Sequence, residues 1–171
     1  ATGTDATLSS GIMAATIRQF SMAATDAVRV ADGLTAAANK SFNSVESLGE
    51  ALSYAGPVAA DANMSLEETL AILGTLGNLG IQGSEAGTAL RRLLTLSASE
   101  SEKFQKVFGV ATKDAQGNAR KLVDVLGEIA AATANMGSGD RAAAFNEVFG
   151  LLGITSASAI GKSVTDTRQL L

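Results

Sequence analysis

The chain has 171 residues, enough for one domain or two small subdomains. Its net charge of −4, its pI near 4.8 and its scattered Lys and Arg residues argue against a surface built to bind nucleic-acid phosphates. The absence of Cys and His excludes thiol nucleophiles, disulfides, imidazole acid–base chemistry and zinc sites of the Cys/His type.

The apolar composition is weighted towards small side chains. Apolar residues make up 46% of the chain, aromatic residues only 4%, and there are 18 glycines. The core must therefore consist of Leu, Val, Ile and a few Phe. Helices lined with Ala and Gly can approach closely, but they bury less area at about 25 cal/mol per Å². We expect a core of modest strength, with marginal stability or support from partner chains.

The N-terminal third is predicted to be helical. Apolar residues recur with loose helical spacing over 4–32, and Asp32-Gly33 predicts the end of this helix, with a short Ala-rich helix over 34–40. Asn43 is the predicted N-cap of the next helix, with Glu46 completing a capping box.

That helix contains Gly56-Pro57. A proline inside a helix removes one backbone hydrogen bond and clashes with the preceding turn. We therefore predict a kink at Gly56 and Pro57, with helix continuing to about residue 62.

Residues 64–96 are the most specific stretch. Ser65 and Glu68 form a second predicted capping box, and the helix that they open is expected to end near Gly80, in a left-handed C-cap. Gly83 or Ser84 is the predicted cap of the following helix. Gly87 lies inside that helix, where glycine costs about 1 kcal/mol against alanine, so a neighbouring helix is expected to approach it closely.

The rest of the chain is predicted to be helical with one interruption. Ser99 and Glu102 suggest a third capping box and a helix to about residue 108. Residues 110–122 break the helical period, and the turn residues over 114–118 predict a small β-hairpin or an extended loop. Further helices are predicted over 122–136, from Ser138 or Asp140 to about 149, and from about 155 past Gly161.

The fold class predicted is all-α: a compact array of short, Gly-broken helices with one small β-hairpin or extended loop near 110–122. We divide the chain into an N-terminal helical segment (1–44), a core region (45–161) and a C-terminal helical tail (162–171), as a piece of a longer chain. The longest charge-free central stretch, 69–84, is too short for a transmembrane helix, which needs roughly 20 residues.

No residue pattern points to catalysis, a cofactor or a metal, so we predict that the chain is not an enzyme. The carboxylate clusters at Glu67-Glu68 and at Glu100 and Glu102 are explained by capping. The stretch 114–118 lacks the alternate oxygen ligands and distal Glu of a calcium loop. The glycines over 77–83 have neither the preceding strand nor the following Lys-Ser/Thr of a phosphate-binding loop.

Arg91 and Arg92 are adjacent on the helix after the glycine turn. They are candidate contacts to a partner, either to its acidic side chains or to phosphates. The alternative is a polar helix face without a dedicated partner.

Residues 48–160 resemble the core region of phage tail tape measure proteins. The resemblance is carried by LGEALSYAGPVAADANMSLEETLAILGTLGNLGIQGSEAGTALRRLL, FGVATKDAQGNARKLVDVLGEIA and GDRAAAFNEVFGLLG, in this order. In this reading Gly80, Gly83, Ser84 and Gly87 form the structural turn of the family motif.

The resemblance implies a structural component of a phage or prophage-derived tail. Such a protein sets tail length, organises tail tube and tip assembly, and is ejected ahead of the DNA. Its implied partners are tail tube and tail-tip or baseplate hub proteins and further copies of itself, a trimer being favoured. It would contact DNA only indirectly and a host membrane transiently. It would be assembled in the bacterial cytoplasm and lie in the lumen or tip of the virion tail.

Two other functions stay open at this point. The chain could be a membrane-inserting or pore-forming segment that aids DNA passage through the host envelope, or a generic bacterial helical adaptor domain. Its many glycines also predict a compact module, because a continuous helix of this length would reach about 260 Å.

Overall fold

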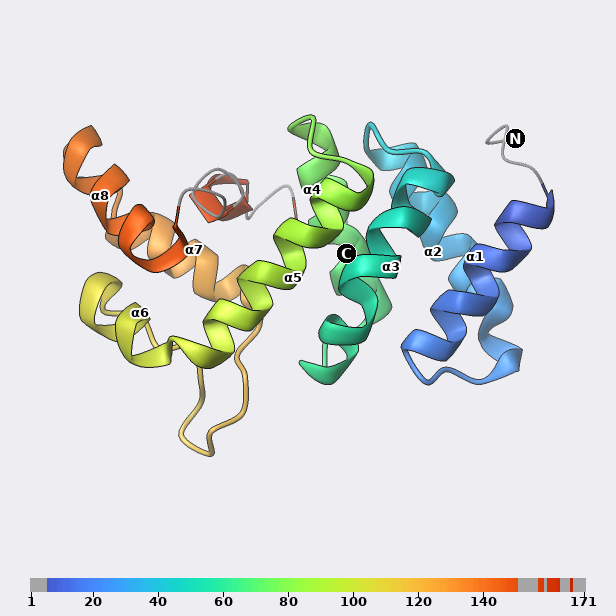
Figure 1. Ribbon diagram of the computed structural model, residues 1–171, viewed down its shortest axis with the longest axis horizontal. Helices are drawn as coiled ribbons and strands as arrows, with labels where there is room; N and C mark the ends of the chain where they lie inside the picture. The colour runs from blue at the N-terminus through green and yellow to red at the C-terminus, as the bar shows by residue number, and fades with distance from the viewer. Residues whose placement is uncertain (1–5, 151–156, 159, 164–166, 168–171) are drawn as a thin grey trace.

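The computed structural model describes residues 6–150, 157–158, 160–163 and 167 (Figure 1). Within 6–150 the chain forms eight α-helices and one 3-10 helix, residues 157–158, 160–162 and 167 are also helical, and no strand is formed among the described residues. The helices are α1 (Ala6–Gln19), η1 (Ala24–Asp26), α2 (Ala27–Lys40), α3 (Val45–Asp61), α4 (Leu66–Asn78), α5 (Gly83–Ser99), α6 (Ser101–Phe108), α7 (Leu122–Ala132) and α8 (Ser138–Phe149). The all-α prediction is confirmed. The start of the last predicted helix, near 155, lies outside the described residues.

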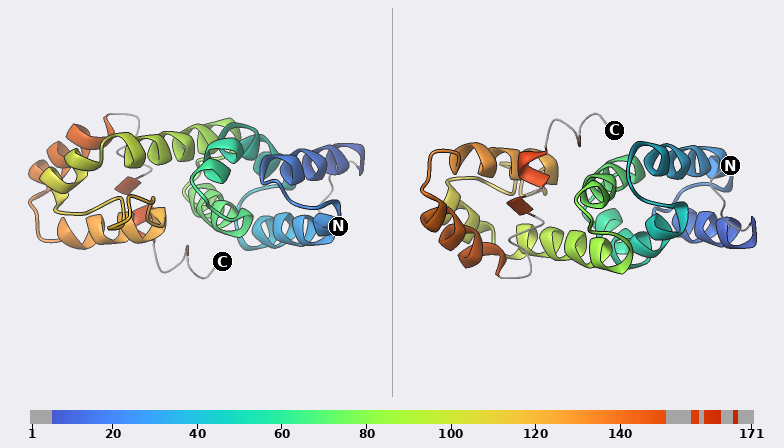
Figure 2. Two further views of the ribbon diagram at one scale, coloured as in Figure 1. Left: turned by 90° about the horizontal axis from the view of Figure 1, so that it is seen from below. Right: turned by 90° about the horizontal axis from the view of Figure 1, so that it is seen from above.

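Helix α5 runs between two groups of helices. Helices α1 to α4 lie at one end of the molecule and α6 to α8 at the other (Figures 1 and 2). The most extensive helix pair is α3 with α5, while α1 packs on α2 and α3, and α2 packs on α4. Helix α5 therefore holds both groups in place.

The helix end predicted beside Gly33 is wrong, because α2 continues through this residue. A Cβ at Gly33 would lie 3.3 Å from Leu70 Cδ1 of α4, so the glycine allows close packing there rather than ending a helix. The break lies at residues 20–23 instead, where Ser21 has φ of +51°.

Three helices end with the same backbone arrangement, a Schellman motif. The residue in the left-handed region is Ser21 after α1 (φ +51°), Asn63 after α3 (φ +55°) and Gly80 after α4 (φ +84°). In each motif the next residue donates its N–H over 2.9 Å to a carbonyl in the last helical turn: Met22 to Ile17, Met64 to Ala59, and Ile81 to Leu76. All three donor residues are apolar and pack on the core, so each chain reversal is anchored there.

The predicted capping box of α4 is confirmed. Ser65 Oγ accepts from the Glu68 N–H at 3.1 Å, and Glu68 Oε2 accepts from the Ser65 N–H at 3.1 Å. The other two predicted boxes are wrong. Ser44 rather than Asn43 caps α3, because Asn43 is drawn into a buried network described below. Ser99 is the last residue of α5 and has no role as a cap, since the chain between α5 and α6 is a single residue.

The β-hairpin predicted near 110–122 is wrong, and the alternative, an extended loop, is found. One isolated antiparallel bridge, Lys113 with Ala119, is formed. The Asp114 carboxylate closes the turn by accepting from the N–H groups of Gln116 (2.9 Å) and Asn118 (2.8 Å). These bonds satisfy the loop locally, and among the described residues no neighbouring strand is available to extend a ladder, so pairing stops after one bridge.

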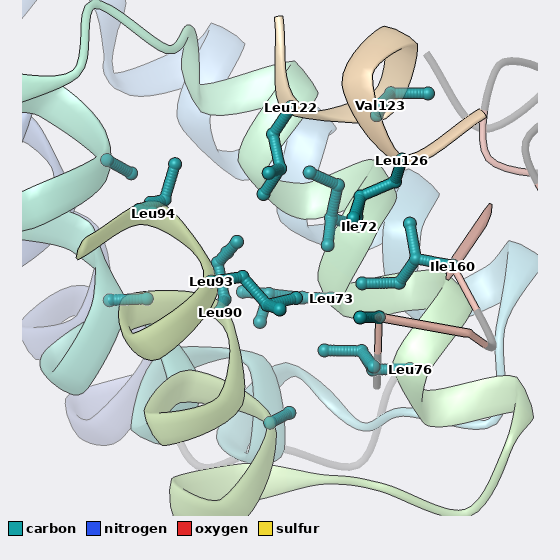
Figure 3. Close-up of a cluster of buried hydrophobic side chains, with 14 of the residues drawn as sticks. Ile72, Leu73, Leu76, Leu90, Leu93, Leu94, Leu122, Val123, Leu126 and Ile160 are labelled. Carbon is teal, nitrogen blue, oxygen red and sulfur yellow. The ribbon is translucent and has the colours of Figure 1, made fainter. Parts of the chain in front are cut away.

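The core is one continuous cluster in which the two groups of helices meet. At its centre, side chains of α4, α5, α7 and Ile160 converge (Figure 3). At the far end, α6 and α8 contribute an aromatic group with ring centroids 5.3 Å apart for Phe104–Phe149 and 5.4 Å for Phe108–Phe145. Four of the seven aromatic residues of this chain thus lie where the packing of α6 and α8 depends on them.

Candidate functional site

The crossing of α3 and α5 fixes the glycine turn that the sequence singles out. A Cβ at Gly87 would come within 2.3 Å of the Ala51 carbonyl oxygen, so only glycine fits at this contact. Gly83, one turn earlier, has φ of +56° and donates its N–H to Ser47 Oγ at 3.0 Å. The small residues of α5 therefore lie directly on the backbone of α3.

The start of α5 differs from the prediction. Gln82 precedes the helix without a side-chain cap bond, Gly83 is its first residue, and Ser84 lies inside the first turn. Ser47 of α3 supplies the hydroxyl that accepts from the Gly83 N–H, so the helix start is satisfied from a neighbouring helix. This contact joins residues 36 positions apart in the sequence, and no local signal could have identified it.

Asn43 links the same region to α4. Its side chain is buried, donates to the Leu73 carbonyl at 3.2 Å and to Ser41 Oγ at 3.1 Å, and accepts from Ser47 Oγ at 3.2 Å. A Cβ at Gly77 would come within 2.0 Å of the Asn43 amide nitrogen, so Gly77 makes room for this side chain. The sequence does not reveal this role, because an Asn before a helix is usually a cap.

The α2–α3 and α4–α5 loops are joined through the backbone of Phe42. The Phe42 N–H donates to Asn78 Oδ1 at 3.0 Å, and the Phe42 carbonyl accepts from Gln82 Nε2 at 2.5 Å. Both loops lie along one edge of the molecule (Figure 1). The Phe42 side chain is 79% exposed and Leu79 is 47% exposed.

Pro57 lies inside α3, which is continuous from Val45 to Asp61. A Cβ at Gly56 would meet Gln19 Oε1 at 2.5 Å, so this glycine accommodates α1. The kink expected at Gly56 and Pro57 stays a prediction.

Arg91 and Arg92 differ in their surroundings. Arg92 donates from Nε (3.2 Å) and Nη2 (3.0 Å) to the Phe149 carbonyl at the end of α8. It therefore has a structural role within the chain, since it satisfies a carbonyl at a helix C-terminus. The partner contact expected of Arg91 and Arg92 stays a prediction.

A cavity of about 1150 Å³ lies between the C-terminal ends of α3 and α5 and the loop before α7. Two of the residues that line it form an ion pair, Lys121 Nζ with Glu68 Oε1 at 2.5 Å. Partial burial raises the pKa of Glu68, but the bonds from Lys121 and Ser65 outweigh it and hold the pKa below its ordinary value. Glu68 therefore caps α4 with one oxygen and ties α4 to α7 with the other.

The neighbouring carboxylate, that of Glu67, has a different partner. Glu67 receives a two-pronged contact from Arg29, with Nε–Oε1 at 2.7 Å and Nη2–Oε2 at 3.0 Å, and this bond lowers the pKa of Glu67. Each of the paired glutamates thus has its own structural partner. Among the described residues there is no group of three or more Asp or Glu placed to hold a metal ion. None of the described helices is both long and apolar enough to span a bilayer.

Comparison with known proteins gives one family. The model of the phage-related minor tail protein family matches residues 1–150. The chain is 36% identical over 142 residues to the tape measure protein of Pneumococcus phage Dp-1, covering 81% of this chain and 12% of that protein. It is 32% identical over 156 residues to the probable tape measure protein of Escherichia phage P2, covering 88% of this chain and 19% of that protein. The chain spans less than a fifth of each relative. No solved structure matches it.

Proposed function

The chain belongs to the phage-related minor tail protein family, and from this premise we propose that it is a compact helical module of a tape measure protein. Its role is structural, as a part of a phage tail. The observation that carries the proposal is the match to two tape measure proteins over 81% and 88% of the chain. In the proposal, the parent protein sets tail length, organises the tube and tip, and leaves the tail ahead of the DNA.

The geometry supports a module rather than the measuring rod itself. The longest described helices, α3 and α5, have 17 residues each, which corresponds to about 26 Å. They pack side by side instead of extending end to end. Length measurement then belongs to other parts of the parent chain, and this module would organise the assembly at the tube or tip.

The rest of the proposal follows from the same premise. The chain acts without catalysis, and its most prominent charged groups serve structural contacts within it. We place it in the lumen or tip of the tail, beside tube and tip or hub proteins, with other copies of itself as a trimer. The division into segments 1–44, 45–161 and 162–171 is part of this proposal.

The test is an in-frame deletion of this module in the full-length gene of the parent phage. A matched deletion of equal length is made in a predicted helical stretch elsewhere in the same gene. The matched deletion should shorten tails by about 1.5 Å per residue removed, whereas deletion of the module should abolish tail assembly. Electron microscopy of the lysate reads out both. Intact tails that are only proportionally shorter after deletion of the module would contradict the proposal.

A further inference from the structure

Phe42 is an exposed aromatic residue on a hydrogen-bonded backbone. Of the large apolar side chains that the structure describes, it is the most exposed, at 79%. The next residue, the polar Asn43, is 8% exposed. This inverts the usual preference of the two residue types.

The exposure does not come from a loose loop. Asn78, the last residue of α4, and Gln82, in the α4–α5 loop, bind the Phe42 N–H and carbonyl. On either side, Ser41 Oγ donates to the Ala37 carbonyl at 2.7 Å and Asn43 is bonded to α4. With both of its backbone polar groups bonded, the backbone of Phe42 is held in place. Only the side-chain torsions of Phe42 then remain to be ordered when a partner covers it.

Three glutamates and one lysine, Lys40 in the last turn of α2, lie on the helix turns next to the loops that hold Phe42. Leu79, next to Asn78, adds a second exposed apolar side chain at the same edge. Glu46 lies in the first turn of α3 and Glu85 in the first turn of α5. Glu50 stands one turn further along α3, and its Oε2 would be 2.5 Å from a Cβ at Gly83. We call Phe42, Leu79 and these glutamates the Phe42 edge.

We propose that the Phe42 edge is a docking surface for another tail protein, one that offers an apolar socket bordered by Lys and Arg. Charge complementarity selects this partner: carboxylates outnumber the single cation, Lys40, beside these apolar side chains, and they favour a socket bordered by cations. A central aromatic anchor with a charged rim is the usual arrangement of an interface hot spot. A second copy docking through its own Phe42 edge is disfavoured as occupant, because the contact would set carboxylates against carboxylates. The inference rests on the proposed function, since it names the surface of the module that would meet its tail partner.

The test uses the protein at its natural length and the purified tube and tip proteins of the parent phage, offered singly. Phe42→Ser should weaken binding to one of them at least about tenfold, the loss typical of a hot-spot residue. Glu50→Gln with Glu85→Gln should slow association and reduce its dependence on salt. The matched control is Val28→Ser, since Val28 is 71% exposed but lies at the opposite end of α2 from the Phe42 edge. It should bind as the wild type does.

The possible results distinguish a failure of the proposed function from a failure of the docking surface alone. If the wild type binds none of the tail proteins, the proposed function fails and this inference fails with it. If the wild type binds and Phe42→Ser binds equally well, only the docking surface is overturned. If Phe42→Ser instead abolishes self-association in sedimentation velocity, the occupant is a second copy and the proposed partner is wrong. Unchanged thermal melting of Phe42→Ser shows that any loss of binding comes from the surface.

Discussion

Gly87 of α5 lies against the backbone of Ala51 of α3, so closely that a Cβ at position 87 would be 2.3 Å from the Ala51 carbonyl oxygen. A glycine in a helix interior costs about 1 kcal/mol against alanine. Here that loss is offset by the close packing of the two helices that share the most extensive contact in the molecule. The crossing of α3 and α5 therefore depends on the absence of a side chain at position 87.

Gly87→Ala is expected to destabilise the protein by about 1–3 kcal/mol, because the carbonyl that the methyl group meets belongs to helical backbone and cannot move alone. Urea denaturation followed by circular dichroism measures the effect. Gly11→Ala is the matched control: Gly11 lies inside α1 with no atom within 4 Å of the added Cβ. It should gain up to about 1 kcal/mol from helix propensity. Equal effects of the two substitutions would show that the α3–α5 contact is not tight.

The residues that end α-helices in a left-handed backbone conformation give a second pair of substitutions. Gly80 has φ of +84° with open space around it, so Gly80→Val should lose about 1–2 kcal/mol from backbone strain alone. Ser21 adopts φ of +51° with a side chain present, so Ser21→Gly should be neutral or slightly stabilising. Thermal melting tests both. A Gly80→Val protein that melts like the wild type would refute the strain argument.

The sequence was sufficient where the deciding interaction is local. The capping box of Ser65 and Glu68 spans three residues, and the left-handed glycine after α4 follows the apolar run that it ends. Close approach at Gly87 was also predictable, because a glycine in a helix needs a compensating contact.

The sequence was insufficient where tertiary contacts decide. Ser21 and Asn63 adopt the left-handed conformation as Gly80 does, but Ser carries no signal for it, and the preference of Asn is weaker than that of glycine. Gly33 signals a helix end, yet it serves packing on α4. The bond from Gly83 to Ser47 joins residues far apart in the chain, so the cap of α5 could not be found from its own neighbourhood.

Asn43 is expected to be the most sensitive polar residue of the α2–α3 loop. Asn43→Ala removes three hydrogen bonds from a buried position and should cost about 1–3 kcal/mol. Asn43→Asp should cost more, because it loses the donor to the Leu73 carbonyl and buries a charge. Urea denaturation at neutral pH compares the two. An Asn43→Asp protein as stable as the wild type would contradict the network.

Substitutions of Arg92 and Arg91 distinguish a structural role within the chain from a contact with a partner. Arg92→Met removes both donors to the Phe149 carbonyl and should destabilise α8 by about 1 kcal/mol, seen as faster hydrogen exchange of its amides. Arg91→Met should leave exchange in α8 unchanged and serves as the control. Faster exchange in both variants would show that the effect comes from the lost charge on α5 rather than from the bond.

Glu68 predicts a dependence of stability on pH. Its pKa is lowered in the folded protein, so its ion pair with Lys121 stabilises the fold fully at neutral pH. This contribution begins to fall near the unfolded-state value of 4.5 and is lost as the pH drops through the folded-state pKa. Glu68→Gln keeps an oxygen that can accept from the Ser65 N–H but lacks the charge, so it isolates the ion pair. Because the contact is partly open to solvent, we expect a loss of only about 0.5 kcal/mol at neutral pH.

The measurement is the free energy of unfolding of the wild type and of Glu68→Gln across the acid range. The difference between them should be constant near neutrality and vanish at low pH, because the protonated Glu68 no longer pairs with Lys121. Lys121→Met should remove the same difference and, combined with Glu68→Gln, add little to it. Additive losses in the double variant would mean that Glu68 stabilises the protein only as the cap of α4.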